Sequence, residues 1–233
     1  MKLTILVPTF NEANHLQELV HRLHTALPFE AEIVLVDDRS SDATPQIAQK
    51  LQREGGPLPV RLYRNSNHRG KGACLRTGLY HAVGELVVVQ DADLEYDPRD
   101  LPALVQPLLR GEADAVYGSR FLRAAWPEGM RWQNLLANRL LTWLANRLYG
   151  LRLTDAYTCY KVVRRELLQR LQMESVGFEW EAEVTAKLGR ARTRIMELPI
   201  RYRGRTRRQG KKIRAGDLWT GIAALLRWRL GPA

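Results

Sequence analysis

Short apolar runs alternate with segments of helical period along the first 120 residues. The apolar runs, which are rich in β-branched residues, lie at Leu3–Val7, Glu32–Val36, Val60–Tyr63, Glu85–Val89 and Ala115–Tyr117. The helical segments between them are His15–Leu27, Asp42–Glu54, Gly72–Val83 and Pro98–Leu109. This alternation predicts an α/β fold, in which a mostly parallel sheet is flanked by helices and joined by right-handed crossovers.

Beyond residue 120 the helical period dominates. Apolar residues recur at helical spacing from Leu136 to Leu148, and Gly150 can end that helix. The remaining predicted elements are helices at Arg164–Leu171 and Glu179–Leu188, a strand at Arg194–Arg201 and a basic amphipathic helix at Asp217–Arg229. No repeat or linker interrupts the pattern, so we expect residues 1–233 to form a single domain.

The composition, 45% hydrophobic and 26% charged, is typical of a globular domain and excludes a disordered chain. Cys74 and Cys159 are too few for a disulfide framework and are too far apart in sequence for a zinc-binding pair, so we expect them to be buried in a reducing compartment. No run of about 18 apolar residues could span a bilayer, and charge follows the first apolar run too soon for a signal peptide. These features predict a cytoplasmic protein.

The formal net charge is +11, from 36 Lys and Arg against 25 Asp and Glu. Part of the excess lies in the window Arg201–Arg214, which contains no acidic residue. Such a window attracts an anionic partner, which in this case can be nucleic acid, an anionic membrane surface or a phosphorylated small molecule. A solvated loop without a partner is the alternative interpretation.

Polar residues follow the ends of four predicted strands. They are Pro8-Thr9-Phe10-Asn11-Glu12, Asp37-Asp38-Arg39-Ser40-Ser41-Asp42, Asp91-Ala92-Asp93-Leu94-Glu95 and Gly118-Ser119-Arg120. Because the carboxyl ends of parallel strands meet at one edge of a sheet, we expect these residues to line a cleft there. A cleft with carboxylates and an arginine can hold a cation and an anion side by side.

The spacing of Asp91, Asp93 and Glu95 can present three carboxylate oxygens to one point, which suits Mg²⁺ or Mn²⁺. The alternative is a solvated turn whose acids cap the helix that begins at Pro98. Of Asp37 and Asp38, we expect one to be structural and the other to accept hydrogen bonds from a ribose or a base.

Five motifs occur in a fixed order along the chain. They are VPTFNE at 7–12, VDDRSSD at 36–42, GKGA at 70–73, DADLE at 91–95 and GSRF at 118–121. Together they resemble the family 2 glycosyltransferases of GT-A (Rossmann-like) fold, and more narrowly the dolichyl-phosphate (polyprenyl-phosphate) mannose and glucose synthases. The likeness continues through TDAYTCYK at 154–161, GFEWE at 177–181 and GRTRRQGKK at 204–212, and so covers nearly the whole chain.

The resemblance implies a role for each of three parts of the chain. Residues 1–120 would bind the nucleotide sugar, residues 121–214 the acceptor, and 215–233 would form the amphipathic helix. The implied nucleoside pocket consists of Pro8, Phe10, Glu12 and Asp38. Asp91 and Ala92 would reach the ribose and the diphosphate, and the metal would be held by Asp91, Asp93 and Glu95, although family relatives often carry Gln at the position of Glu95.

For the acceptor, the resemblance implies that Arg120 grips a phosphate, with Arg131 as the second arginine and Arg139 as its competitor. Lys211 or Lys212, together with Arg205, would close over the diphosphates. The catalytic residues would then be Asp91, Asp93 and Arg120. No Glu is followed by Asp in this chain, although transferases that act on a sugar hydroxyl often use such a pair as a base.

A phosphate acceptor explains the missing base, because phosphate is already ionised near neutral pH and requires only positive charge. Glu179, Glu181 or Glu183 remains an alternative base. We therefore expect a metal-dependent inverting transferase that moves mannose or glucose from GDP-mannose or UDP-glucose to polyprenyl or dolichyl phosphate. The motif QxxRW of processive polysaccharide synthases is absent.

Other functions are less consistent with the sequence. A sugar nucleotidyltransferase would carry a glycine-rich basic loop after the first strand, where this chain has PTFNE. A nucleic-acid-binding module conflicts with the acids at the strand ends, so no nucleic acid partner is expected. A glycosyltransferase with a soluble acceptor stays open.

The membrane contact also has two interpretations. In the first, the basic window and Asp217–Arg229 lie on an anionic membrane surface, with Trp219 and Trp228 near the headgroups, so that the protein is peripheral on the cytoplasmic face. In the second, that helix packs on the sheet as core cover.

Overall fold

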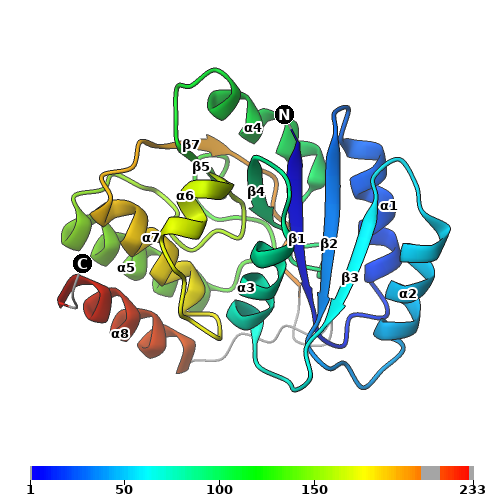
Figure 1. Cartoon of the computed structure of the whole chain (residues 1–233). Coiled ribbons are helices and arrows are strands. Elements are labelled where there is room, and N and C mark those ends of the chain that lie inside the picture. Colours follow the sequence, from blue (N-terminus) through cyan, green and yellow to red (C-terminus); the bar gives the residue numbers. More distant parts are fainter. Residues whose placement is uncertain (1, 206–215, 231–233) are drawn as a thin grey trace.

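A seven-stranded sheet of order β3-β2-β1-β4-β6-β5-β7 organises the computed structural model, which describes residues 2–205 and 216–230 (Figure 1). The strands are β1 (Leu3–Thr9), β2 (Ala31–Asp37), β3 (Val60–Arg64), β4 (Leu86–Val89), β5 (Ala115–Ser119), β6 (Lys161–Arg164) and β7 (Ile195–Pro199). β1 pairs in parallel with both β2 and β4, and every residue of β2 and β4 is buried. Continuous apolar strands of this kind need cover on both faces, as the sequence pattern predicted.

Helices supply that cover. They are α1 (Leu16–Ala26), α2 (Thr44–Glu54), α3 (Lys71–His81), α4 (Leu101–Leu109, preceded by the 3₁₀ turn Pro98–Asp100), α5 (Trp132–Tyr149), α6 (Arg165–Arg170), α7 (Trp180–Arg190) and α8 (Gly216–Leu230). Figure 1 shows α1 and α2 beside the β3 end of the sheet, and α5, α7 and α8 beyond its other end. Gly150 ends α5 in the left-handed conformation, with φ 67°, as expected of a helix-ending glycine. The predicted α/β class with a mostly parallel sheet is confirmed.

The sequence pattern missed β6, which runs antiparallel between β4 and β5. The pattern predicts an element only for Arg164 of this strand, as the first residue of the following helix. The strand is four residues long and begins with the buried charge of Lys161, so it lacks a clear apolar run. Its insertion separates β5 from β4 in the sheet.

The C-terminal helix α8 packs against α7 and α5. Leu225 is fully buried, and the Nζ of Lys187 lies 3.8 Å from the centre of the Trp228 ring. Trp228 is partly buried in this packing, whereas Trp219 is exposed, and the predicted contact of this helix with a membrane stays a prediction. No helix within residues 2–205 and 216–230 is both long enough and apolar enough to cross a membrane.

Candidate active site

The loops after β1, β2 and β4 meet at one edge of the sheet, because β1 lies between β2 and β4 in parallel register. Each loop holds one non-glycine residue with positive φ, namely Asn11 (52°), Arg39 (66°) and Leu94 (60°). Asn tolerates this left-handed conformation, but it is unfavourable for Arg and Leu and persists there only where surrounding contacts enforce it. Backbone strain is thus present in the loops after β2 and β4, at the edge where the sequence predicted the cleft.

Hydrogen bonds lock the first two loops together. The Asn11 amide donates to Ser40 Oγ at 2.9 Å, and the Asn11 side chain accepts from the Ser41 amide at 2.9 Å. The Glu12 amide donates to Thr44 Oγ1 at 2.8 Å. The loops therefore hold Glu12 in place, and the Glu12 side chain is buried at this edge.

Asp37 and Asp38 are both committed to protein partners. Asp37 pairs with Arg64 at 2.9 Å. Asp38 accepts from Asn65 Nδ2 at 2.7 Å and from the Gly70 amide at 2.7 Å. Burial opposes the Asp38 charge, but these bonds outweigh burial and lower the pKa of Asp38. Asp38 thereby fixes the turn that leads into α3, and its predicted nucleoside contact stays a prediction.

An aromatic pair lies beside Asp38. The rings of Phe10 and His68 are 4.2 Å apart at 30°, and His68 Nδ1 is 2.8 Å from Asp38 Oδ2. More than half of the His68 side chain is exposed, and Pro8 and Phe10 are half-buried. Pro8 and Phe10 are predicted from the sequence, whereas His68 is not, although it lies in the glycine-rich turn that leads into α3.

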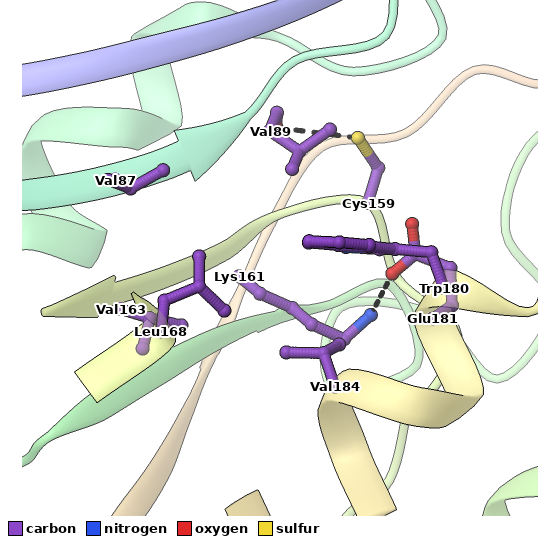
Figure 2. A pocket seen from close by; sticks show the side chains of 9 residues that line it. All are labelled: Val87, Val89, Cys159, Lys161, Val163, Leu168, Trp180, Glu181 and Val184. Carbon is purple, nitrogen blue, oxygen red and sulfur yellow. Dashed lines mark hydrogen bonds and ion pairs between the residues drawn. The ribbon is translucent and has the colours of Figure 1, made fainter. Parts of the chain in front are cut away.

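Asp91 belongs to a chain of alternating charges that runs into the protein. Both its oxygens contact Lys71 Nζ, at 2.8 and 2.9 Å, and the same Nζ lies 3.1 Å from Glu181. Glu181 in turn pairs with Lys161, as Figure 2 shows. Burial opposes the charge of Lys71, but Asp91 and Glu181 outweigh it and raise its pKa, whereas burial dominates at Lys161 and lowers its pKa.

A small cavity lies beside this chain of charges. Its volume is about 10 Å³, room for roughly one water molecule. Its walls are formed by Val87, Val89, Cys159, Lys161, Val163, Leu168, Trp180, Glu181 and Val184 (Figure 2). The cavity is too small to hold a substrate.

Asp93 and Glu95 lie next to a positively charged segment that follows β7. Arg205 Nη2 is 3.2 Å from Asp93, and Arg205 Nη1 is 3.4 Å from Glu12. Glu95 accepts from the Arg205 amide at 2.8 Å and from the Tyr202 hydroxyl at 2.7 Å. Burial, with the charges of Asp91 and Glu95, raises the pKa of Asp93 to about 7.

The donor chemistry at this edge fits a hard divalent cation, because Asp91 and Asp93 offer carboxylate oxygens, and burial together with the charges of Asp91 and Glu95 raises the pKa of Asp93. Within the part of the chain that the structure describes, no three His, Cys, Asp or Glu side chains are arranged to hold a metal ion together. The set of Asp91, Asp93 and Glu95 therefore stays a prediction. Mg²⁺ commonly takes only one or two carboxylates and completes its shell with phosphate and water.

Arg120, at the end of β5, is buried in a bidentate pair with Asp155. Its Nε and Nη2 lie 2.7 and 2.8 Å from the two Asp155 oxygens, and Nη2 also reaches the Tyr157 carbonyl at 3.2 Å. This structure thus shows Arg120 in a structural role. Its Nη1 takes no part in these bonds, and the predicted contact of Arg120 with an acceptor phosphate stays a prediction.

The other predicted residues are spread around the edge. Ala92 is buried between Asp91 and Asp93, and Arg131 lies exposed immediately before α5. Lys211 and Lys212 lie outside the described residues. Lys71 lies in the motif GKGA and Asp155 in the motif TDAYTCYK, but the sequence predicts no ion pair for either residue and offers Glu181 only as an alternative base. Their partners are distant in sequence, so spacing could not have revealed these roles.

Comparison with known proteins adds independent findings. Residues 4–172 match the family described as glycosyl transferase family 2. The chain is 30% identical over 235 residues to the dolichol-phosphate mannosyltransferase of Pyrococcus furiosus, a match that covers 98% of this chain and 64% of that protein. It is 30% identical over 241 residues to the undecaprenyl-phosphate mannosyltransferase of Micrococcus luteus, with 99% of this chain and 95% of that protein covered.

Among solved structures, the fold is similar to that of glucosyl-3-phosphoglycerate synthase from Mycobacterium tuberculosis. That crystal structure contains Mn²⁺, uridine diphosphate and phosphoglyceric acid. The TM-score is 0.72 at 22% identity, and the match covers 100% of this chain and 80% of that one.

Proposed function

The chain belongs to glycosyltransferase family 2 and has the GT-A fold, and from this premise we propose that it transfers a hexose from a nucleotide sugar to polyprenyl phosphate. The observation that carries the proposal is the juxtaposition, at one edge of the sheet, of the carboxylates Asp91 and Asp93 with the cationic segment at Arg205. The two relatives whose names specify polyprenyl-type phosphates as acceptors support the acceptor class. Because the chain spans only 64% of the Pyrococcus protein, the acceptor, the donor and the partners are all part of the proposal.

We assign the divalent cation, Mg²⁺ or Mn²⁺, to Asp91 and Asp93. Glu95 would be a third ligand only if its carboxylate gave up its hydrogen bonds with the Tyr202 hydroxyl and the Arg205 amide. When bound, such a cation offsets charge on the departing nucleoside diphosphate. The protein itself contributes Lys71, which Glu181 and Asp91 hold at the N-terminus of α3, where cationic groups and backbone amides favour phosphate.

The acceptor phosphate needs no general base, since it is already ionised. We propose that it attacks the anomeric carbon in line with the leaving group, which inverts that carbon. Arg205, with Arg131 from the start of α5, would hold the phosphate and reduce its repulsion from the diphosphate. The half-buried ring of Phe10, beside His68 and Asp38, is the surface we assign to the nucleoside, together with Pro8, Glu12 and the backbone of Ala92.

The names of the relatives favour mannose as the hexose. GDP-mannose and UDP-glucose are both retained as donors, because the Phe10 and His68 rings present a stacking surface that accepts either base.

A lipid acceptor requires contact with a membrane, and α5 offers a surface for it. Trp132, Leu136, Leu140 and Trp143 recur along one face of α5 and are exposed by 57, 57, 44 and 61%. The sequence pattern had treated Leu136, Leu140 and Trp143 as an ordinary helical stripe, but the structure turns them to solvent. An exposed apolar stripe with tryptophans at both ends is typical of a helix that lies in a membrane interface.

The start of this stripe is close to the acidic edge. The loop before α5 contacts the segment that carries Arg205, since the Gly204 amide donates to the Glu128 carbonyl at 2.9 Å. A Cβ on Gly129 would lie 2.4 Å from the Gly204 carbonyl oxygen, so this close approach requires glycine. A lipid that enters along α5 would therefore bring its phosphate to Arg131 and Arg205.

The activity is tested with the purified protein, Mg²⁺ or Mn²⁺ and a panel of nucleotide sugars, with and without polyprenyl phosphate. We expect release of nucleoside diphosphate and formation of a lipid-linked hexose only when the lipid phosphate is present. Asp93→Asn should lose about three orders of magnitude in turnover. Asp97→Asn is the matched control, because Asp97 lies in the same loop but pairs with Arg99 and Arg201.

If turnover with a soluble phosphorylated acceptor equals turnover with polyprenyl phosphate, the lipid acceptor in this proposal is wrong. No release from any nucleotide sugar, under conditions where the protein is folded, would contradict the transferase activity itself.

A further inference from the structure

Arg205 occupies the position of a cation among the site carboxylates. Its guanidinium lies between Asp93 and Glu12, at 3.2 and 3.4 Å, and only 11% of its side chain is exposed. Its Nε is 4.0 Å from Glu95, which is too far for a hydrogen bond, and it is buried without a hydrogen-bond partner. The negative cluster that we assign to a divalent cation thus already contains a positive group of the protein.

The contacts of Arg205 are loose compared with those of Arg120. Arg120 meets Asp155 at 2.7 and 2.8 Å, the distances of strong charge-assisted hydrogen bonds. Arg205 instead makes one long contact to each of two carboxylates and leaves a buried N–H unpaired, which costs free energy in this pose. The short contacts of Arg120 are those of a permanent structural pair with Asp155. The long contacts of Arg205 are those of a side chain that can leave its carboxylate partners.

The backbone around Arg205 is held independently of its side chain. The Arg205 amide donates to a Glu95 oxygen, the Tyr202 hydroxyl donates to the other, and the Arg203 amide donates to the Glu95 carbonyl at 2.9 Å. A change of side-chain rotamer can therefore move the guanidinium out of the cluster while the segment stays in place. Lys71 differs, because Asp91 and Glu181 hold its ammonium from two sides.

We infer that Arg205 is an internal counterion that competes with the divalent cation for Asp93 and leaves the cluster when that cation binds. The inference rests on the proposed metal site at Asp91 and Asp93. While the guanidinium lies between Asp93 and Glu12, its charge is offset by those two carboxylates, so it has to leave them to offset the charge of the acceptor phosphate. Binding of the cation with the donor would consequently release Arg205 for the acceptor, so the metal and the donor bind before the lipid phosphate.

The inference is tested by titrating the protein with Mn²⁺ alone, in the absence of nucleotide, and following the electron paramagnetic resonance signal of free Mn²⁺. We expect Arg205→Gln to bind Mn²⁺ about tenfold more tightly than the unmodified chain, because a competing charge within contact distance is removed. The tighter site should vanish when Asp93→Asn is added to Arg205→Gln. Arg203→Gln is the matched control, since it removes the same charge from an exposed side chain that pairs with Glu128 at 3.1 Å.

The outcomes separate this inference from the proposed function. If Arg205→Gln and the unmodified chain bind Mn²⁺ equally, and both depend on Asp93, the counterion role is wrong and the metal site stands. Equal tightening by Arg203→Gln would attribute the effect to net charge and overturn the inference. If no variant shows a site that depends on Asp93, both the counterion role and the assigned metal site fail.

Discussion

Asp93 lies in an unfavourable environment for a carboxylate. Burial and the charges of Asp91 and Glu95 raise its pKa to about 7, and Arg205 only partly offsets them. In contrast, Asp97, four residues later, has a pKa lowered to about 2, above all by its hydrogen bond with Arg99. The pKa values of two aspartates in one loop are thus shifted in opposite directions. Asp93, whose charged form is destabilised by its surroundings, is the one assigned to function.

The sign of the effect follows from proton binding. Between pH 3.8 and about 7 the folded protein holds a proton on Asp93 that the unfolded chain has lost, so stability falls as pH rises through this window. We expect Asp93→Asn to raise the free energy of unfolding at pH 8 by about 2 kcal/mol, and to change it little near pH 4. Urea denaturation with a chelator present measures both values.

Asp97→Asn is the control of opposite sign. The low pKa of Asp97 stabilises the folded state above pH 3.8, and that contribution is lost as pH falls toward about 2. At pH 8 this variant should lose about 1 kcal/mol, since solvent around the exposed Arg99 weakens the pair. A stabilising Asp97→Asn, or a destabilising Asp93→Asn, would contradict the assignment.

Arg120 leads to a second prediction at the residue scale. Because Asp155 is fully buried and holds Arg120 bidentately, Asp155→Asn should leave a buried guanidinium without its counter-charge and cost about 3 kcal/mol. Glu112→Gln removes the partner of Arg110 in an exposed pair at 4.0 Å and should cost less than about 0.5 kcal/mol. Urea denaturation of both variants is the measurement, and equal losses would disprove a structural role for the Arg120 pair.

At the scale of elements, α5 and α8 both depart from what periodicity alone suggests. α8, a candidate for the membrane surface, buries Leu225 and packs Trp228 against α7, but it leaves Trp219 exposed. α5 looked like an ordinary packing helix, but it leaves Trp132 and Trp143 exposed at the two ends of its stripe. A helical period shows only that one face is apolar, and the neighbouring helices decide which face they cover.

The membrane role of α5 is testable by vesicle co-sedimentation. The double variant Trp132→Ser, Trp143→Ser should lose about tenfold or more in binding to anionic vesicles, with a melting temperature close to that of the unmodified chain, because both side chains are exposed. Tyr80→Ser on α3, where the side chain is 81% exposed, is the control and should bind normally. Unchanged binding by the double variant would remove α5 from the proposal.

For the whole molecule, the site joins parts that are distant in the chain. Arg205 reaches Glu12 across 193 positions, because the segment after β7 returns over the ends of β1 and β4. The net charge of +11 includes basic residues of the segment that reaches this edge, so positive and negative groups meet at the site. The excess of Lys and Arg over the whole chain suits the proposed contact with an anionic membrane.

Salt should therefore act on the membrane contact. Binding to vesicles rich in phosphatidylglycerol should fall by about tenfold between 0.1 and 1 M NaCl, over which the Debye length shrinks from about 10 to about 3 Å. Vesicles of phosphatidylcholine alone should bind more weakly at low salt. Binding that is indifferent both to salt and to lipid charge would rule out an electrostatic contribution.

The sequence by itself determined the alternation of strands and helices, the edge at which the polar loops meet and the family to which the motifs belong. These properties are local: they depend on periodicity, on turn residues and on short spacings, and β1, β2 and the carboxylates of the Asp91–Glu95 loop were all predicted in this way.

Only the tertiary structure decided which charges are paired. It tied Arg120 to Asp155, Asp91 through Lys71 to Glu181, and Asp93 to Arg205. Each of these contacts joins residues at least 20 positions apart, and the sequence does not show which acidic residue pairs with which basic residue. The same reason applies to β6 and to the exposed face of α5, because burial is a property of neighbours that the fold alone brings together.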